Sequence, residues 1–153
     1  MVKSYRGAGS IKSAEPKVQA VHVENYMTRR LVTFHPDHTM EHVIDTLLKK
    51  NISGGPVIDD NGKLCGIISE GDCLKEVVKG KYNNSPSLSG KVSEHMAKEV
   101  KTVTPDMNIF ELADMFLTIK LRRFPVLQDG KLVGQISQKD VMKAVTKLNN
   151  TTW

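Results

Sequence analysis

The chain contains one stretch of sequence twice, and this duplication constrains its fold more than any other feature of its 153 residues. The segment that begins at Val23 aligns without a gap with the segment that begins at Val92 as far as Asp60 and Asp129, and the second copy then lacks a counterpart of Asn61. Identical pairs run through both copies: Met27 and Met96, Thr33 and Thr102, Pro36 and Pro105, Pro56 and Pro125, Gly66 and Gly134, Ser69 and Ser137, and Asp72 and Asp140. Such matching predicts two copies of one structural unit.

Each copy predicts the same order of secondary structure. A β-branched run at residues 31–34 or 100–103 ends near a proline, which indicates a strand and a turn. Thr39 and Asn108 then stand as helix N-caps before apolar residues with a helical period. A Pro-Val strand, an Asn-Gly or Asp-Gly turn and a second apolar run predict a hairpin, and Ser69 and Ser137 begin a closing helix. The predicted fold class is α/β (α+β), with two β-α-β-β-α repeats.

A single repeat is too small to be stable alone. A unit of roughly 55 residues buries little surface, and its helices cover only one face of its sheet, so we expect the two repeats to pack through their sheets. The predicted organisation is a flexible basic tail at 1–18, a first repeat at 19–79, a linker at 80–90, a second repeat at 91–149 and a C-terminal tail at 150–153.

Charge and cysteine content narrow the function without identifying it. The net charge of +5 favours anionic partners in general, but much of the excess lies in the first 20 positions, at Lys3, Arg6, Lys12 and Lys17. No apolar stretch reaches the roughly 20 residues of a membrane span, and no signal peptide is recognisable. We therefore expect a cytoplasmic protein that does not insert into a membrane, with Cys65 and Cys73 reduced.

The string Pro-Val-x-x-x-x-Gly-Lys-Leu-x-Gly-x-Ile-Ser-x-x-Asp, present again with one residue fewer in the second copy, resembles the CBS (cystathionine β-synthase) domain. The resemblance covers residues from about 21 to 148. It implies a Bateman module, in which two repeats pack about a pseudo-twofold axis and leave two clefts. By the same resemblance, the clefts hold AMP, ADP, ATP or S-adenosylmethionine, no cofactor is required, and two modules join as a homodimer.

The chemistry that fits such a ligand lies at Ser69 with Asp72 and at Ser137 with Asp140. An ionised aspartate at the start of a helix can accept hydrogen bonds from the two hydroxyls of a ribose, and the helix N-terminus offers backbone N–H groups to phosphate. The alternative interpretation is a capping box, in which the aspartate bonds back to the N–H of its own serine. The two roles can coexist.

The resemblance also implies which residues share a cleft. Asp72 is expected to face the loop of the other repeat at Leu121, Arg122 and Arg123, whose guanidinium groups suit phosphate. Asp140 is expected to face Ile52, Ser53 and Gly54, with Lys139 as a further phosphate contact and Ile52 against the base. A solvated basic turn remains the alternative for Arg122 and Arg123.

Metal binding and enzymatic catalysis find little support in the sequence. His35, His38 and His42 invite a metal hypothesis, but their counterparts in the second copy are Thr104, Met107 and Glu111, and we predict no metal site. No phosphate-binding Gly-Lys-Ser/Thr loop and no nucleophile beside a base is recognisable, so we predict no enzymatic activity.

The leading hypothesis is a non-catalytic regulatory module that binds an adenine nucleotide or S-adenosylmethionine and signals to a client protein. The first alternative is a CBS-pair assembly protein that works without a ligand. The third hypothesis, ranked last because aromatic residues make up only 5% of the chain, is nucleic-acid binding through the basic tail.

Overall fold

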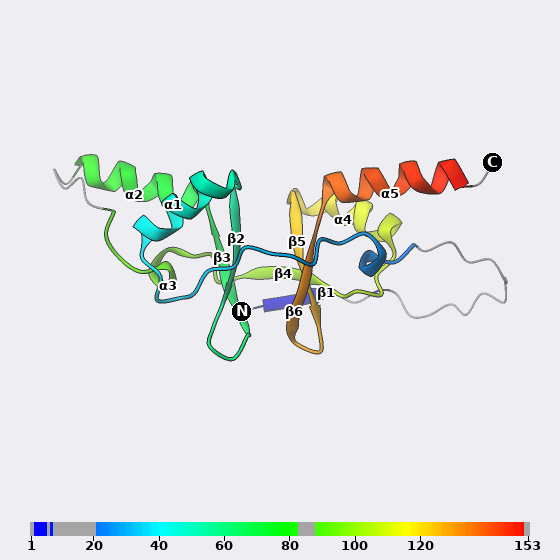
Figure 1. The fold of residues 1–153 in the computed structure, drawn as a ribbon, viewed down its shortest axis with the longest axis horizontal. Helices are drawn as coiled ribbons and strands as arrows, with labels where there is room; N and C mark the ends of the chain where they lie inside the picture. Colours follow the sequence, from blue (N-terminus) through cyan, green and yellow to red (C-terminus); the bar gives the residue numbers. More distant parts are fainter. Residues whose placement is uncertain (1, 6, 8–20, 83–87, 152–153) are drawn as a thin grey trace. The chain divides into compact units, whose positions relative to one another are not determined.

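A computed structural model describes residues 2–5, 7, 21–82 and 88–151 (Figure 1). The chain divides into two compact units. The first unit comprises Met1–Val2 and Val32–Val100, and the second comprises Lys3–Leu31 and Lys101–Trp153. The predicted α/β class is confirmed, and so is the β-α-β-β-α order in the second repeat; the first repeat has the same order without its leading strand.

The first unit is a hairpin with helices beside it. Strands β2 (Gly54–Ile58) and β3 (Leu64–Ser69) pair antiparallel, and helices α1 (Met40–Lys50), α2 (Glu70–Tyr82) and the short α3 (Val92–His95) accompany them. As predicted, Thr39 caps α1, because its Oγ1 accepts a hydrogen bond from the backbone N–H of His42 at 3.0 Å. Gly62 supplies the positive φ of 77° that the hairpin turn requires.

The second unit repeats this plan with two more strands. Strands β5 (Arg123–Gln128) and β6 (Lys131–Ser137) form the hairpin, and β4 (Val100–Val103) runs parallel to β5. Helices α4 (Ile109–Ile119) and α5 (Gln138–Thr151) complete the repeat. Asp129 and Gly130 both have positive φ, 52° and 81°, as the predicted Asp-Gly turn requires.

The prediction of a strand over residues 31–34 is wrong, because most of this run forms no β-pairing. Only Phe34 pairs, through one parallel bridge to Val57, whereas the equivalent residues of the second copy form β4. The difference arises because β4 has strands on both sides, in the order β1-β4-β5-β6, while among the described residues the sheet of the first unit is the β2-β3 pair alone.

The prediction of a flexible tail is also wrong at its start, since Val2–Tyr5 forms strand β1 beside β4. The hydroxyl of the fully buried Thr102 donates to the carbonyl oxygen of Lys3 at 3.1 Å, and the N–H of Thr104 donates to Tyr5 at 3.1 Å. The basic residues of this segment predicted a tail. An edge of β4 without a neighbour would present unpaired backbone N–H and C=O groups, and β1 pairs with that edge. The rest of the predicted tail, residues 8–18, lies outside the described residues.

The segment that leads into each repeat belongs to the core of the other unit. Val23, in the 3-10 helix η1 (Val23–Asn25), is fully buried in the second unit, and Val92, in α3, is fully buried in the first. The same hydrogen bonds hold both segments: Val23 N–H donates to Met107 O at 2.8 Å, and Val92 N–H donates to His38 O at 2.8 Å. The compact units therefore differ from the sequence repeats at their leading ends.

Each unit has its own apolar core between hairpin and helices. The first core consists of Phe34, Met40, Val43, Leu47, Val57, Ile68, Cys73 and Val92. The second consists of Val23, Val103, Met107, Leu112, Phe116, Phe124, Val126, Ile136 and Val141. Most of these positions correspond between the two copies, which explains why the apolar pattern repeats.

Candidate functional site

The serine and aspartate singled out in each repeat meet at the start of the closing helix. Ser69 donates to Asp72 Oδ2 with both its backbone N–H (2.9 Å) and its hydroxyl (3.1 Å). Ser137 makes the same two bonds to Asp140 Oδ2, both at 2.9 Å, and its Oγ accepts from the N–H of Asp140 at 3.1 Å. This geometry confirms the capping interpretation, in which serine and aspartate bind each other across the first turn.

Capping leaves each aspartate able to act on a ligand. Both serine bonds converge on Oδ2, and in the described part of the chain no hydrogen bond is formed by Oδ1 of Asp72 or Asp140. Both carboxylates are half-buried. An oriented carboxylate with one unused oxygen suits a ribose hydroxyl.

In the second unit, the loop formed by Leu121, Arg122 and Arg123, here called the arginine loop, lies beside the start of the closing helix. The backbone N–H of Gln138 donates to Arg122 O at 3.0 Å, and its side-chain Nε2 donates to Leu121 O at 2.9 Å. Arg123 pairs directly with Ser137 across the β5–β6 hairpin. The structure therefore brings the backbone of the two arginines beside the first residues of the closing helix of their own repeat. The expected pairing of Asp72 with this loop joins residues of different units and stays a prediction.

The corresponding place in the first unit is built in the same way but carries different charges. Gly54 pairs with Ser69 across the β2–β3 hairpin, and the N–H of Glu70 donates to Ser53 O at 2.9 Å. Where the second unit has Gln138 and the exposed Lys139, the first has Glu70 and Gly71. By sequence, this place in the second unit is the more positively charged of the two, because it has Arg122, Arg123 and Lys139 where the first unit has Ser53, Gly54 and Gly71.

Two predicted ligand contacts of the first unit serve the fold itself. A Cβ on Gly54 would stand 2.7 Å from Ile68 O and 3.1 Å from the Cα of Ser69, so this glycine permits close approach of β3. Ile52 is half-buried and packs against the core of the first unit. Both residues nevertheless lie at the same end of the hairpin as Ser69 and Asp72.

Sequence reasoning missed the side chain that fixes the arginine loop. Gln138 is exposed, yet its amide holds the carbonyl of Leu121. The only signal in the sequence is that glutamine replaces Glu70 of the first copy, and a carboxylate at this position cannot donate to a carbonyl. The difference between the two repeats therefore has a structural consequence at the site.

The histidine and cysteine hypotheses can be checked against the side chains. Within the described ranges, no group of three or more His, Cys, Asp or Glu side chains is arranged to hold a metal ion. Cys73 is buried in the first core, and Cys65 is half-buried. Burial raises the pKa of both thiols above the ordinary value, which favours the thiol over the nucleophilic thiolate.

None of the helices described here is both long and apolar enough to span a bilayer.

The fold and the duplicated serine-aspartate motif identify the class of protein. The family model of the CBS domain matches residues 23–79 and 92–147, and the chain belongs to the CBS domain family. The resemblance noted in the sequence is thereby confirmed.

Among solved structures, that of CBSX2 in complex with AMP has a TM-score of 0.74 and 29% sequence identity, covering 85% of this chain and 99% of that one. As a sequence, CBSX2 is a chloroplastic CBS domain-containing protein of Arabidopsis thaliana, 28% identical over 85% of this chain and 66% of its own length. The CBS domain pair of MJ0100, solved with 5-methylthioadenosine and S-adenosyl-L-methionine, has a TM-score of 0.66 over 83% of this chain and 97% of that one; at 23% identity it shows the shared fold alone.

Other relatives are longer than this chain. MJ1225 of Methanocaldococcus jannaschii is 26% identical, and the match covers 79% of this chain and 41% of that protein. Inosine-5'-monophosphate dehydrogenase of Aquifex aeolicus is 31% identical, and the match covers 86% of this chain and 26% of the enzyme. The chain thus spans less than half the length of either of these relatives.

Proposed function

We propose that this chain is a non-catalytic regulatory module of the cytoplasm that binds an adenine nucleotide and signals to a client protein. Support comes above all from the second unit, where the backbone of Arg122 and Arg123 lies beside Gln138 and Ser137, and Ser137 holds the carboxylate of Asp140. CBSX2, which shares the fold at 29% identity, was solved with AMP. AMP is therefore the first ligand to test, followed by ADP, ATP and S-adenosylmethionine.

The proposed contacts follow the chemistry of a nucleoside phosphate. Oδ1 of Asp140 accepts hydrogen bonds from the ribose hydroxyls, while Oδ2 stays with Ser137. The phosphate lies against Arg122 and Arg123 near the start of α5, where guanidinium groups and the helix dipole both favour negative charge. The base packs against apolar side chains at the end of the hairpin. Leu121, which is exposed in the arginine loop, is one of them.

A weaker second site is proposed at Ser69 and Asp72, with Ile52, Ser53 and Gly54 nearby. The same capped carboxylate stands there, but Glu70 replaces the neutral Gln138. We infer that this site prefers a ligand with less negative charge, such as a nucleoside or S-adenosylmethionine.

A test measures nucleotide affinity by calorimetry in variants that keep the helix cap. Arg122→Ala and Asp140→Asn are each expected to lower AMP affinity about tenfold or more, because each removes a charge-assisted hydrogen bond. For 2'-deoxy-AMP, Asp140→Asn is expected to matter less than for AMP.

The controls decide which aspartate serves the arginine loop. A double-mutant cycle between Arg122→Ala and Asp140→Asn is expected to show coupling, and one between Arg122→Ala and Asp72→Asn is not. Coupling to Asp72 instead would support the arrangement expected from the sequence, in which Asp72 and the arginine loop of the other repeat share one ligand. Unchanged affinity in both single variants would remove the proposed site and favour an assembly protein that needs no ligand.

The exposed apolar helix faces support a homodimer as the working form. Leu48 and Leu117 occupy matching positions on α1 and α4 and are 76% and 79% exposed, and Leu74 and Met142 do the same on α2 and α5. Large apolar side chains in such number on helices indicate a protein interface. We propose a second copy of the chain as the partner, because the repeat presents the same pattern in each unit.

A further inference from the structure

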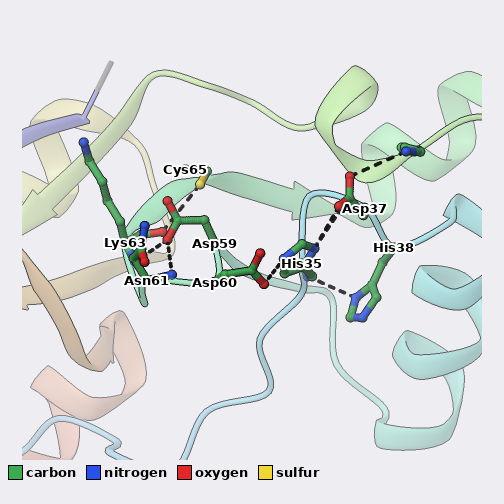
Figure 2. Close-up of polar contacts among 9 residues, drawn as sticks. His35, Asp37, His38, Asp59, Asp60, Asn61, Lys63 and Cys65 are labelled. Atoms are coloured by element: carbon green, nitrogen blue, oxygen red, sulfur yellow. Dashed lines mark hydrogen bonds and ion pairs between the residues drawn. The ribbon is translucent and has the colours of Figure 1, made fainter.

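Three histidines of the first unit form a cluster that the proposed function does not use. Figure 2 shows His35 and His38 in the turn before α1, close to the β2–β3 hairpin. The rings of His38 and His42 lie 4.2 Å apart between centroids, and those of His35 and His38 lie 6.0 Å apart. Phe34 meets both His38 and His42 edge-on at 6.4 Å.

The hydrogen bonds of this turn require neutral imidazoles. The backbone N–H of His35 donates to Nδ1 of His38 at 3.0 Å, and the N–H of Asp37 donates to Nδ1 of His35 at 3.0 Å. Each Nδ1 is therefore an acceptor, and the proton of each neutral ring is on Nε2. A second proton on Nδ1 of His38 would face the N–H of His35, so the bond would be lost.

The charged groups around the cluster treat the histidines unequally. His35 has two carboxylates near it, Asp60 at 2.8 Å from Nε2 and Asp37 at 3.8 Å from Nδ1. On α1, His42 shares a groove with Glu41 and Asp45. Asp37 also lies 3.6 Å from Nζ of Lys91. For His38, whose ring faces the other two histidines, no ion pair is found among the described residues.

The surroundings of His38 set the direction of its response to pH. Partial burial, then the neighbouring His42 and His35, lower the pKa of His38 below the ordinary value of about 6.5. The unfolded turn, with an ordinary pKa, takes up a proton before the folded turn does. The contribution of His38 to the stability of the folded turn is therefore present above about pH 6.5 and is lost as the pH falls below it.

The turn that His38 holds is also the attachment point of the connector between the repeats. Val92 N–H donates to His38 O at 2.8 Å, Ser93 N–H to Pro36 O at 3.0 Å, and Met40 N–H to Gly90 O at 3.2 Å. We propose that the histidine cluster is a pH-responsive latch, in which protonation of His38 opens the turn and loosens residues 90–93 from the first unit. The second unit has no such latch, because Met107 replaces His38 and makes the same backbone bond to Val23.

Amide hydrogen exchange of the full chain without nucleotide tests the latch. After correction for intrinsic rates, protection of Val92 and Ser93 is expected to fall about tenfold between pH 7.5 and 5.5, the effect of losing one hydrogen bond. Val23 and Glu24, whose N–H groups donate to Met107 O and Pro105 O, serve as the internal reference and are expected to keep their protection.

Two variants make the result specific. In His38→Asn the amide oxygen replaces Nδ1 as the acceptor but does not titrate, so protection of Val92 is expected to stay constant over this range. His22→Asn, on the exposed His22 of the second unit, is expected to behave as the wild type. If His38→Asn does not fold, His38→Met, which carries the residue of the second copy, takes its place. An unchanged wild-type connector, or an equal loss in the His38 variant, would overturn the latch. Because nucleotide is absent, either result leaves the proposed ligand site untouched.

Discussion

Two glycines illustrate how a single residue ties a leading segment to its unit. A Cβ on Gly66 would stand 2.6 Å from Ala97 O and 2.7 Å from Met96 Sδ, and one on Gly134 would stand 2.8 Å from Met27 Sδ. The bonds between Ile67 and Ala97 explain why the chain approaches so closely, with N···O distances of 3.0 and 2.9 Å. The recurrence of glycine and methionine at these places is one structural requirement met twice.

The close contacts around Gly66 predict how an added methyl group changes the stability of the protein. Gly66→Ala is expected to destabilise the protein by about 1–3 kcal/mol, because backbone of the leading segment must move to admit it. The matched control is Gly71→Ala on α2 of the same unit, where the nearest atom is 3.7 Å away and alanine favours the helix. Denaturant unfolding checks both; a Gly66→Ala variant as stable as the control would show that the segment does not dock there.

Whether a matching segment forms a strand in each repeat depends on the strands that pair with it more than on its own sequence. The run at residues 31–34 makes one bridge, while the matching run forms β4 because β1 pairs with it. The helices, by contrast, begin where their caps predict, at Thr39 and Asn108, since capping depends only on residues within one turn. Local signals were thus sufficient for helices and turns but not for sheet edges.

The exchanged leading segments predict how the chain behaves when divided. Residues 1–82 and 88–153, produced separately, are each expected to be unfolded, because each unit then lacks the buried valine, Val23 or Val92, that the other fragment carries. Mixing the two fragments is expected to restore the folded circular dichroism spectrum and a cooperative melt. Independent folding of either fragment would show that its leading segment is dispensable.

At the scale of the whole molecule, the apolar helix faces predict self-association. Leu117→Asp is expected to convert a dimer into a monomer in light scattering, because a charge replaces a large apolar side chain that is 79% exposed on α4. The neighbouring Thr118→Asp, on an exposed polar residue of the same helix, is the control and is expected to stay dimeric. A wild-type chain that is monomeric at all concentrations would contradict the homodimer.

The sequence by itself determined the duplication, the helix-hairpin-helix order of both repeats, the caps, the Gly turns and the serine-aspartate pairs. All of these depend on residues close together in the chain or on a repeat that alignment reveals. Only the tertiary structure decided that β1 covers β4, that η1 and α3 join the opposite units, and that Arg122 and Arg123 lie beside Ser137. These contacts join residues far apart in sequence, whose partners no local period or propensity specifies.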